Sequence, residues 1–339
     1  MSWQDEFRDS LKSTQELNAF FDHQFSETNY PIFIPKSFAK KIKEYGEGSP
    51  LWNQFLPNQS ENESIGRIDP IGDKIHSKGN QLIHRYENRV LFTPTTVCPV
   101  QCRYCFRKNE LSAKDEIFDA NFEAAKKYLS TQPEVNEVIF TGGDPLILSD
   151  EKIAHYLQEF AEIESIKYIR FHTRTPIILP SRIDDGFISI MTSAKYLFKR
   201  ALLMIHVNHL AEIDEEVESA INRLNEAGIE VLSQTVLLKG INDQTEILEV
   251  LFNKLADLKV TPYYLHHPDE ALGAMHFGMS LEEGRRIVHP LHSKLSGWAT
   301  PKYVIDIPGG EGKISAVNPE DFTFKGELLN RLGNKIKIK

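Results

Sequence analysis

From Arg89 onward, short runs of β-branched and other apolar residues alternate with longer amphipathic segments. Seven runs have the composition of strands, at residues 89–97, 137–142, 167–173, 201–207, 229–236, 261–267 and 301–307. Segments with a helical spacing of apolar residues lie between them, at 119–130, 214–228, 244–258 and 280–295. Strands that alternate with helices favour parallel βα units, because a parallel connection requires a crossover segment. The pattern therefore predicts an α/β fold, either a barrel or an open sheet.

Residues 1–85 lack this alternation and are predicted to form a helical, loop-rich extension. Within it, SFAKKIKEYG at 37–46 has the pattern of a helix that ends at a glycine, and a polar stretch follows at 59–64. We therefore expect an N-terminal helical extension over 1–85, a barrel domain over 86–315 and a C-terminal tail over 316–339.

Composition limits the class of protein. The 339 residues are 41% hydrophobic and 26% charged, which is typical of a globular protein with a substantial core. A net charge of −9 argues against a general nucleic-acid-binding surface. No apolar run approaches the roughly 18 to 20 residues that span a bilayer, and the polar start MSWQDEFRDS is unlike a signal peptide. The expected location is the cytoplasm, with neither a membrane nor a nucleic acid as partner.

Polar, ligand-capable residues lie in or just after the carboxyl ends of the first six predicted strands. In chain order they are Cys98, Gly142 to Asp144, Arg174, Asn208 with His209, Gln234 and Asp269. Any one of them could be a solvated loop residue. In α/β barrels, however, the active site is built from loops at the carboxyl ends of the strands. The series therefore favours a partial (β/α)6 barrel with an active site at that end.

The chain has three cysteines, Cys98, Cys102 and Cys105, within eight positions. An odd count without a secretion signal argues against disulfides, and the clustering argues against ordinary buried thiols. Structural zinc takes four protein ligands, so His84 or His172 would have to complete such a site. An iron–sulfur cluster on three thiolates would instead leave one iron open to a non-protein ligand. The spacing favours this last interpretation.

A lysine near the carboxyl end follows a glycine-rich turn, in YVIDIPGGEGKISAV. The Walker pattern of a phosphate-binding loop is not met. Lys313 is then either a surface lysine or a Schiff-base lysine that carries pyridoxal phosphate. The second interpretation requires phosphate anchors, which Arg85, Tyr86 and Arg89 could supply.

Together these motifs resemble the lysine 2,3-aminomutase family of radical S-adenosylmethionine enzymes, over about residues 84–313. Tyr104, just before the third cysteine, also fits the radical S-adenosylmethionine superfamily. The motifs that occur in the family's order are HRYENRVLF, CPVQCRYCFRK, FTGGDPL, RTPIILPSRI, SQTVLLKGIND, PYYLHHPDEALGAMHF and DIPGGEGK. The resemblance implies a partial radical-SAM barrel.

The resemblance also implies three cofactors: a four-iron, four-sulfur (4Fe-4S) cluster, S-adenosyl-L-methionine and pyridoxal 5′-phosphate. The cluster ligands would be Cys98, Cys102 and Cys105. Lys313 would carry pyridoxal phosphate, and the positions around its phosphate would be Arg85, Tyr86, Arg89 and Gln234. The positions beside S-adenosylmethionine would be Gly142, Gly143, Asp144 and His206. The substrate carboxylate would pair with Arg107, and the ε-ammonium of lysine with Asp269 and Asp306.

The charges at these last positions suit lysine. A buried ammonium is costly unless its charge is compensated, and two converging carboxylates can compensate it. With Arg107 at the other end, the site would hold a zwitterion of the length of lysine. Each acid has a structural alternative, since Asp306 could cap the turn before Pro308 and Asp269 could cap a following helix.

The implied activity is the interconversion of L-lysine and L-β-lysine by 2,3-migration of the amino group, with an electron donor such as flavodoxin or ferredoxin. Gln244 stands where long members have a zinc-binding cysteine, and the compact length resembles the branch that makes β-lysine for elongation factor P. DIPGGEGK is closer to enzymes of free L-lysine, which we favour as substrate. The sequence leaves the oligomeric state open, and a homo-oligomer is one possibility.

Two other classes of function remain open at this point. One is a radical S-adenosylmethionine enzyme that uses no pyridoxal phosphate and acts on another small molecule or a protein side chain. The other is a non-catalytic module that binds zinc. Neither alternative explains why Lys313, Arg107 and both aspartates match family positions.

Overall fold

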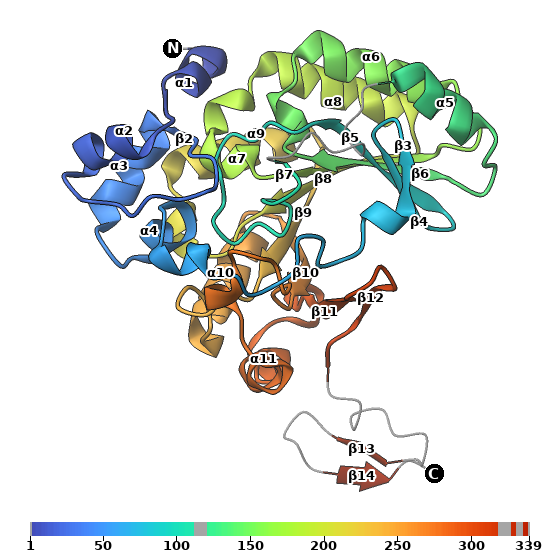
Figure 1. The fold of residues 1–339 in the computed structure, drawn as a ribbon. Helices are drawn as coiled ribbons and strands as arrows, with labels where there is room; N and C mark the ends of the chain where they lie inside the picture. Colours follow the sequence, from blue (N-terminus) through green and yellow to red (C-terminus); the bar gives the residue numbers. More distant parts are fainter. Residues whose placement is uncertain (1, 112–120, 318–326, 330–334, 338–339) are drawn as a thin grey trace.

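A computed structural model describes residues 2–111, 121–317, 327–329 and 335–337. Its main element is a ten-stranded sheet in the order β12-β11-β10-β9-β8-β7-β6-β5-β4-β3 (Figure 1). The strands from β5 to β11 all run parallel to their neighbours. Their bounds are β5 (Arg89–Thr95), β6 (Glu137–Gly142), β7 (Tyr168–Thr173), β8 (Arg200–His206), β9 (Glu230–Val236), β10 (Thr261–His266) and β11 (Lys302–Ile307). The predicted α/β class and all seven predicted strands are confirmed.

Most connections between these strands are helical. The helices are α5 (Phe122–Ser130), α6 (Asp150–Ala161), α7 (Thr175–Ile178), α8 (Asp185–Leu197), α9 (Glu215–Glu226), α10 (Thr245–Asp257), α11 (Leu281–Val288) and α12 (Leu291–Lys294). The helix predicted over 119–130 begins outside the described residues. The one predicted over 280–295 is divided, because Pro290 has no N–H to continue the hydrogen bonding of α11.

Short antiparallel strands border the parallel strands on both sides. β4 (Leu82–Tyr86) and β3 (Ser77–Gly79) lie beyond β5, and β12 (Gly312–Ser315) lies beyond β11. Within the described residues no strand pairing joins β3 to β12, so the sheet is a partial barrel. The two ends still meet, because the Tyr86 hydroxyl accepts a hydrogen bond of 2.8 Å from the Lys313 amide.

A close backbone approach helps to bring these ends together. A Cβ atom on Gly72 would lie 2.4 Å from the amide nitrogen of Gly310, in the turn between β11 and β12. Only a glycine at position 72 allows the turn to come this near. The glycine-rich turn therefore packs against the segment before β3.

The N-terminal region is mainly helical, as predicted. Its elements are α1 (Trp3–Arg8), β1 (Ser10–Leu11), α2 (Thr14–Phe21), β2 (Ile34–Pro35), α3 (Lys36–Tyr45) and α4 (Pro50–Phe55). The helix α3 ends at Gly46, at a φ of 82°. These helices lie on the α7 and α9 side of the sheet (Figure 1), and their apolar residues share one core with the barrel. The division of the chain at residues 85 and 315 stays a prediction, although β3 and β4 already belong to the main sheet.

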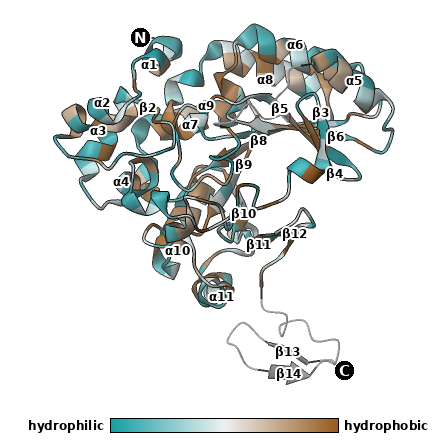
Figure 2. Ribbon diagram, viewed as in Figure 1, coloured by the Kyte–Doolittle hydropathy of each residue, from teal (hydrophilic) through white to brown (hydrophobic). Residues whose placement is uncertain are grey.

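Hydrophobic residues concentrate on the central strands and on the helices that cover them (Figure 2). Among the described residues, none of the helices combines the length and the hydrophobicity needed to cross a bilayer.

Near the end of the chain, β13 (Glu327–Leu329) pairs with β14 (Lys335–Lys337). The remainder of the predicted tail after residue 317 lies outside the described residues.

Candidate active site

The sheet and its loops form a cavity of about 530 Å³. The residues to which the family resemblance assigned a site role all line it: Cys98, Cys102, Cys105, Arg107, Gly142, Gly143, Asp144, His206, Gln234, Arg85, Tyr86, Arg89, Asp269, Asp306 and Lys313. Strand residues reach it at every second position, as Leu202, Met204 and His206 do on β8. The cavity therefore brings the cysteine loop and Lys313 together around one space.

The three cysteines lie on the loop after β5. Cys102 Sγ is 3.1 Å from Nη1 of Arg174, which donates to it. Burial raises the pKa of all three thiols, to about 12 for Cys105. Thiolates at this place therefore need a cationic partner, and the irons of a cluster would supply one. The donor set fits the cluster that the spacing predicted.

The zinc alternative gains no support from the geometry. His84 does not line the cavity, and its Nδ1 lies 2.8 Å from the Tyr128 hydroxyl. His172 lines the cavity from β7, whereas the three cysteines lie on the loop after β5. Among the described residues, no three His, Cys, Asp or Glu side chains converge as ligands of a single ion would.

The loop after β6 packs directly on the start of the cysteine loop. The Gly143 amide donates to the Thr95 carbonyl and the Asp144 amide to the Val97 carbonyl, both at 2.8 Å. The Asp144 carboxylate accepts from the Thr173 hydroxyl and the Arg174 amide, both at 2.7 Å. Asp144 therefore fixes the end of β7 in addition to lining the cavity.

Replacing Gly143 by alanine should destabilise this packing. Its Cβ would lie 2.3 Å from the Val97 carbonyl oxygen, and a backbone atom cannot move away cheaply. We expect a loss of about 1–3 kcal/mol of unfolding free energy and less iron per chain. Thermal unfolding and iron content measure both effects. Gly297→Ala is the control, because nothing lies within 4 Å of a Cβ there. Equal stability and iron content in the two variants would contradict this account.

Arg174 is held in place on several sides. Its Nη2 donates to Glu212 Oε2 at 2.7 Å and to Gln54 Oε1 at 3.1 Å. Its Nη1 also contacts the hydroxyl of Tyr104, which lies 2.7 Å from Nε2 of His206. Burial lowers the pKa of His206 well below its ordinary value, so this imidazole is neutral. The arginine is thus fixed as a donor to the cysteine loop.

Two residues expected at the active-site end serve the fold instead. Asn208 and His209 follow β8 as predicted, but neither is among the residues that line the cavity. The Asn208 amide donates to Gln54 at 3.0 Å, and His209 caps the short helix η6 (Leu210–Glu212). Their expected place in the site is therefore wrong, because their polar groups satisfy neighbouring backbone and side-chain groups.

The hairpin of β11 and β12 places an acid opposite the predicted cofactor lysine. Asp306 and Lys313 are cross-strand partners, and Lys313 Nζ lies 3.0 and 2.8 Å from the two carboxylate oxygens. Asp306 therefore binds an ammonium and does not cap the turn. Asp269 caps no helix either, since the next helical turn is the 3₁₀ helix η7 (Met275–Phe277).

Burial and, secondly, repulsion by the Asp306 carboxylate raise the pKa of Asp269 to about 7. A further cation close to the pair would relieve this repulsion. The two acids can therefore accept one more positive charge.

An aspartate that the sequence analysis missed links two of the predicted arginines. Asp73 Oδ1 accepts from Arg85 Nη2 at 2.7 Å, and Asp73 Oδ2 lies 2.5 Å from Arg107 Nη2. Nε of Arg85 and Nη1 of Arg107 are buried and make no hydrogen bond to any described residue, although Nη1 of Arg107 lies 3.6 Å from Oε2 of Glu110 in an ion pair. Buried donors normally have partners, so these two are suited to an anionic group such as a phosphate or a carboxylate.

Two further histidines belong to the site: His266 was missed by the sequence analysis, and His172 was considered there only as a zinc ligand. His172 on β7 and His266 on β10 line the cavity. Burial lowers the pKa of His266 to about 3 and that of His172 well below its usual range, so both are neutral. Both lie at the every-second position that faces the cavity, a periodicity that could have identified them. Asp73 comes from an irregular segment and carries no such signal.

Comparison with known proteins gives consistent matches. Residues 92–251 match the model of the radical SAM superfamily. A protein named L-lysine 2,3-aminomutase from Buchnera aphidicola is 35% identical over 311 residues, which cover 90% of this chain and 91% of that protein. The protein of the same name from Escherichia coli is 35% identical, over 84% of this chain and 82% of its own length.

Longer relatives match as well. The L-lysine 2,3-aminomutase of Clostridium subterminale is 30% identical over 92% of this chain, but the match covers 76% of that protein. Among solved structures, SuiB from Streptococcus suis bound to S-adenosylmethionine has a TM-score of 0.48 and 16% identity, over 67% of this chain and 52% of that chain.

Proposed function

Since the chain belongs to the L-lysine 2,3-aminomutase family of radical S-adenosylmethionine enzymes, we propose that it interconverts free L-lysine and L-β-lysine with pyridoxal phosphate bound to Lys313. One observation carries the proposal. A single cavity is lined by the three cysteines, by Arg107 and by the Lys313–Asp306 pair. Such a lining would supply ligands for a radical source, an amino group for a carbonyl cofactor and charged contacts for both ends of an amino acid.

Family membership implies a 4Fe-4S cluster and S-adenosylmethionine, and the proposed cluster ligands are Cys98, Cys102 and Cys105. Bound and reduced, these groups supply an organic radical that takes a hydrogen atom from the substrate. The chain contributes the enclosing walls, which keep water and other reactants away from the radical. Arg174 contributes a donor to the sulfur of Cys102.

For pyridoxal phosphate, the proposed attachment is the amino group of Lys313. The bound cofactor supplies a conjugated ring that holds the migrating nitrogen and spreads unpaired electron density. Asp306 orients the amino group of Lys313, and the hydroxyl of Tyr86 fixes the backbone of the same residue. Nε of Arg85 is buried without a hydrogen-bond partner among the described residues, and it would donate to the phosphate of the cofactor.

The acids Asp269 and Asp306 are proposed to bind the ε-ammonium of lysine. Asp306 binds the ammonium of Lys313 in this structure, and with Lys313 engaged by pyridoxal phosphate the same carboxylate would be available to the substrate ammonium. Arg107 is proposed to pair with the substrate carboxylate. This arrangement favours lysine over glutamate, whose side-chain carboxylate the two acids would repel.

A panel of amino acids tests this assignment. The protein is reconstituted anaerobically with all three cofactors and given lysine, ornithine, arginine or glutamate. We expect both 5′-deoxyadenosine and a β-amino acid with lysine, at least about tenfold faster than with the others. Faster conversion of another amino acid would contradict the proposed substrate.

The pH dependence should report Asp269. Its pKa of about 7 means that the carboxylate is charged above this pH and neutral below it, whereas the lysine ammonium stays charged throughout. A neutral acid cannot compensate the ammonium, so kcat/KM for lysine should fall about tenfold per pH unit below about pH 7. In Asp269→Asn the activity should be lower and this acid limb should disappear. An unchanged acid limb in the variant would assign it to another group.

A further inference from the structure

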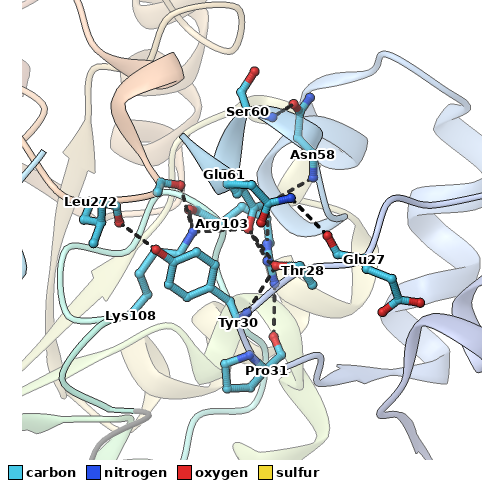
Figure 3. A network of polar contacts seen from close by, with 12 residues as sticks. Glu27, Thr28, Tyr30, Pro31, Asn58, Ser60, Glu61, Arg103, Lys108 and Leu272 are labelled. Atoms are coloured by element: carbon cyan, nitrogen blue, oxygen red, sulfur yellow. Dashed lines mark hydrogen bonds and ion pairs between the residues drawn. The ribbon is translucent and has the colours of Figure 1, made fainter. Parts of the chain in front are cut away.

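A buried polar cluster joins the N-terminal region to the cysteine loop. We call it the junction cluster; its members are Thr28, Tyr30, Glu61, Arg103 and Lys108 (Figure 3). Arg103 donates to Glu61 through Nε at 2.8 Å and through Nη2 as well. Arg103 Nη2 also donates to the Thr28 hydroxyl at 3.0 Å. The Arg103 and Glu61 side chains are 1% and 0% exposed, so their geometry is protected from solvent.

Lys108 extends the cluster to a third part of the chain. Its ammonium donates to the carbonyls of Arg103 and Gly273, both at 2.9 Å, and to Glu61 at 3.3 Å. It also lies 3.7 Å from the ring centroid of Tyr30. Gly273 belongs to the loop after β10 that carries Asp269. A single lysine therefore ties the cysteine loop to the loop of a proposed substrate-binding acid.

Tyr30 makes a second tie to the same loop. Its hydroxyl donates to the Leu272 carbonyl at 3.1 Å (Figure 3). A Cβ atom on Gly273 would lie 2.2 Å from this hydroxyl oxygen, so the loop packs directly on Tyr30. On the other side, the Arg103 amide donates to the Gln54 carbonyl at 2.8 Å. The N-terminal region thus holds both loops in fixed positions.

Burying two cations with one carboxylate is an expensive way to stabilise a fold. Apolar residues of similar volume would often do so equally well, whereas hydrogen-bonded charges fix directions and distances. A displacement of about 1 Å between reacting groups can cost a hundredfold in rate. The cluster is therefore better suited to fixing a distance than to adding stability.

We propose that the junction cluster is a positioning device, which sets the distance between the cysteine loop and the loop of Asp269. Lys108 and Tyr30 are its positioning residues, and the N-terminal region is a working part of the active site. The inference rests on the proposed function for its catalytic consequence. Its structural consequence, the restraint of residues 270–276, is independent of the substrate.

Lys108→Met is the principal test, because it leaves the Glu61–Arg103 pair intact and removes the ties to the two carbonyls. The holoenzyme should keep the wild-type iron content. It should release about tenfold more 5′-deoxyadenosine per β-lysine formed, since the radical would meet a misplaced substrate. Hydrogen exchange of residues 270–276 should also become faster. Tyr30→Phe should change both readouts in the same direction, to a smaller extent.

Two control variants lie outside the cluster. Lys126→Met removes an ion pair with Glu159, and Tyr128→Phe removes the contact with His84. Both should keep the wild-type product ratio and exchange rates.

The outcomes separate the alternatives. Less iron with an unchanged product ratio and unchanged exchange in the remaining holoenzyme would mean a merely structural role and overturn the proposal. If Lys108→Met does not fold, Tyr30→Phe decides by the same criteria. If the wild-type protein forms 5′-deoxyadenosine without β-lysine, the proposed function fails. The exchange of residues 270–276 then still decides whether the ties restrain the loop, and unchanged exchange in Lys108→Met overturns the proposal.

Discussion

Replacement of Lys313 by alanine should lower the formation of β-lysine by more than about a thousandfold, because it removes the proposed attachment point of pyridoxal phosphate. Lys313 is the only lysine among the described residues that line the cavity, so no neighbour can take over its role. Iron content should stay at the wild-type level, since no hydrogen bond among the described residues joins the cysteine loop to the hairpin of Lys313. β-Lysine by chromatography, iron per chain and the visible absorption of the cofactor are the measurements.

Lys302→Ala is the matched control for this experiment. Lys302 lies on the same hairpin but is exposed and does not line the cavity. Its replacement should leave both cofactor absorption and β-lysine formation near the wild-type values. Full cofactor absorption in Lys313→Ala would show that pyridoxal phosphate is attached elsewhere.

Replacement of Cys105 by alanine should give the opposite separation of effects. With two thiolates in place of three, the cluster should not assemble, and neither 5′-deoxyadenosine nor β-lysine should form. Pyridoxal phosphate should still bind at Lys313, because the hairpin that carries it is unchanged. Iron and sulfide content, together with cofactor absorption, measure both halves of this prediction.

Val97→Ala serves as the control for the cysteine variant. Val97 is 45% exposed and lies on the same loop, so its truncation should preserve the cluster. Unchanged iron in Cys105→Ala, or zinc in place of iron in the wild-type protein purified anaerobically, would contradict the cluster assignment.

Much of the fold could be predicted because parallel strands are buried on both faces and therefore have a distinct composition. All seven predicted strands occur, and EVIFTG forms β6 at the predicted residues. The antiparallel strands β3, β4 and β12 were not predicted, because they are short and contain polar residues such as Lys78 and Arg85. Only tertiary pairing makes them part of the sheet.

The candidate site was predictable to a different degree. The rule that active sites lie at the carboxyl ends of strands placed Cys98 and Asp269 correctly at the cavity. The same rule failed for Asn208, because a polar side chain at a strand end can also satisfy nearby backbone groups. Asp73 was missed because its position depends on a segment outside the alternating pattern. No sequence periodicity carries that information.

The proposed aminomutase activity is tested most simply by a time course of β-lysine formation by the wild-type protein. The protein is reconstituted anaerobically with iron, sulfide and pyridoxal phosphate, then supplied with S-adenosylmethionine, a reductant and free L-lysine. β-Lysine should accumulate until it reaches equilibrium with lysine, and omission of any one cofactor should prevent this. Formation of 5′-deoxyadenosine while L-lysine remains unchanged would contradict the proposed activity.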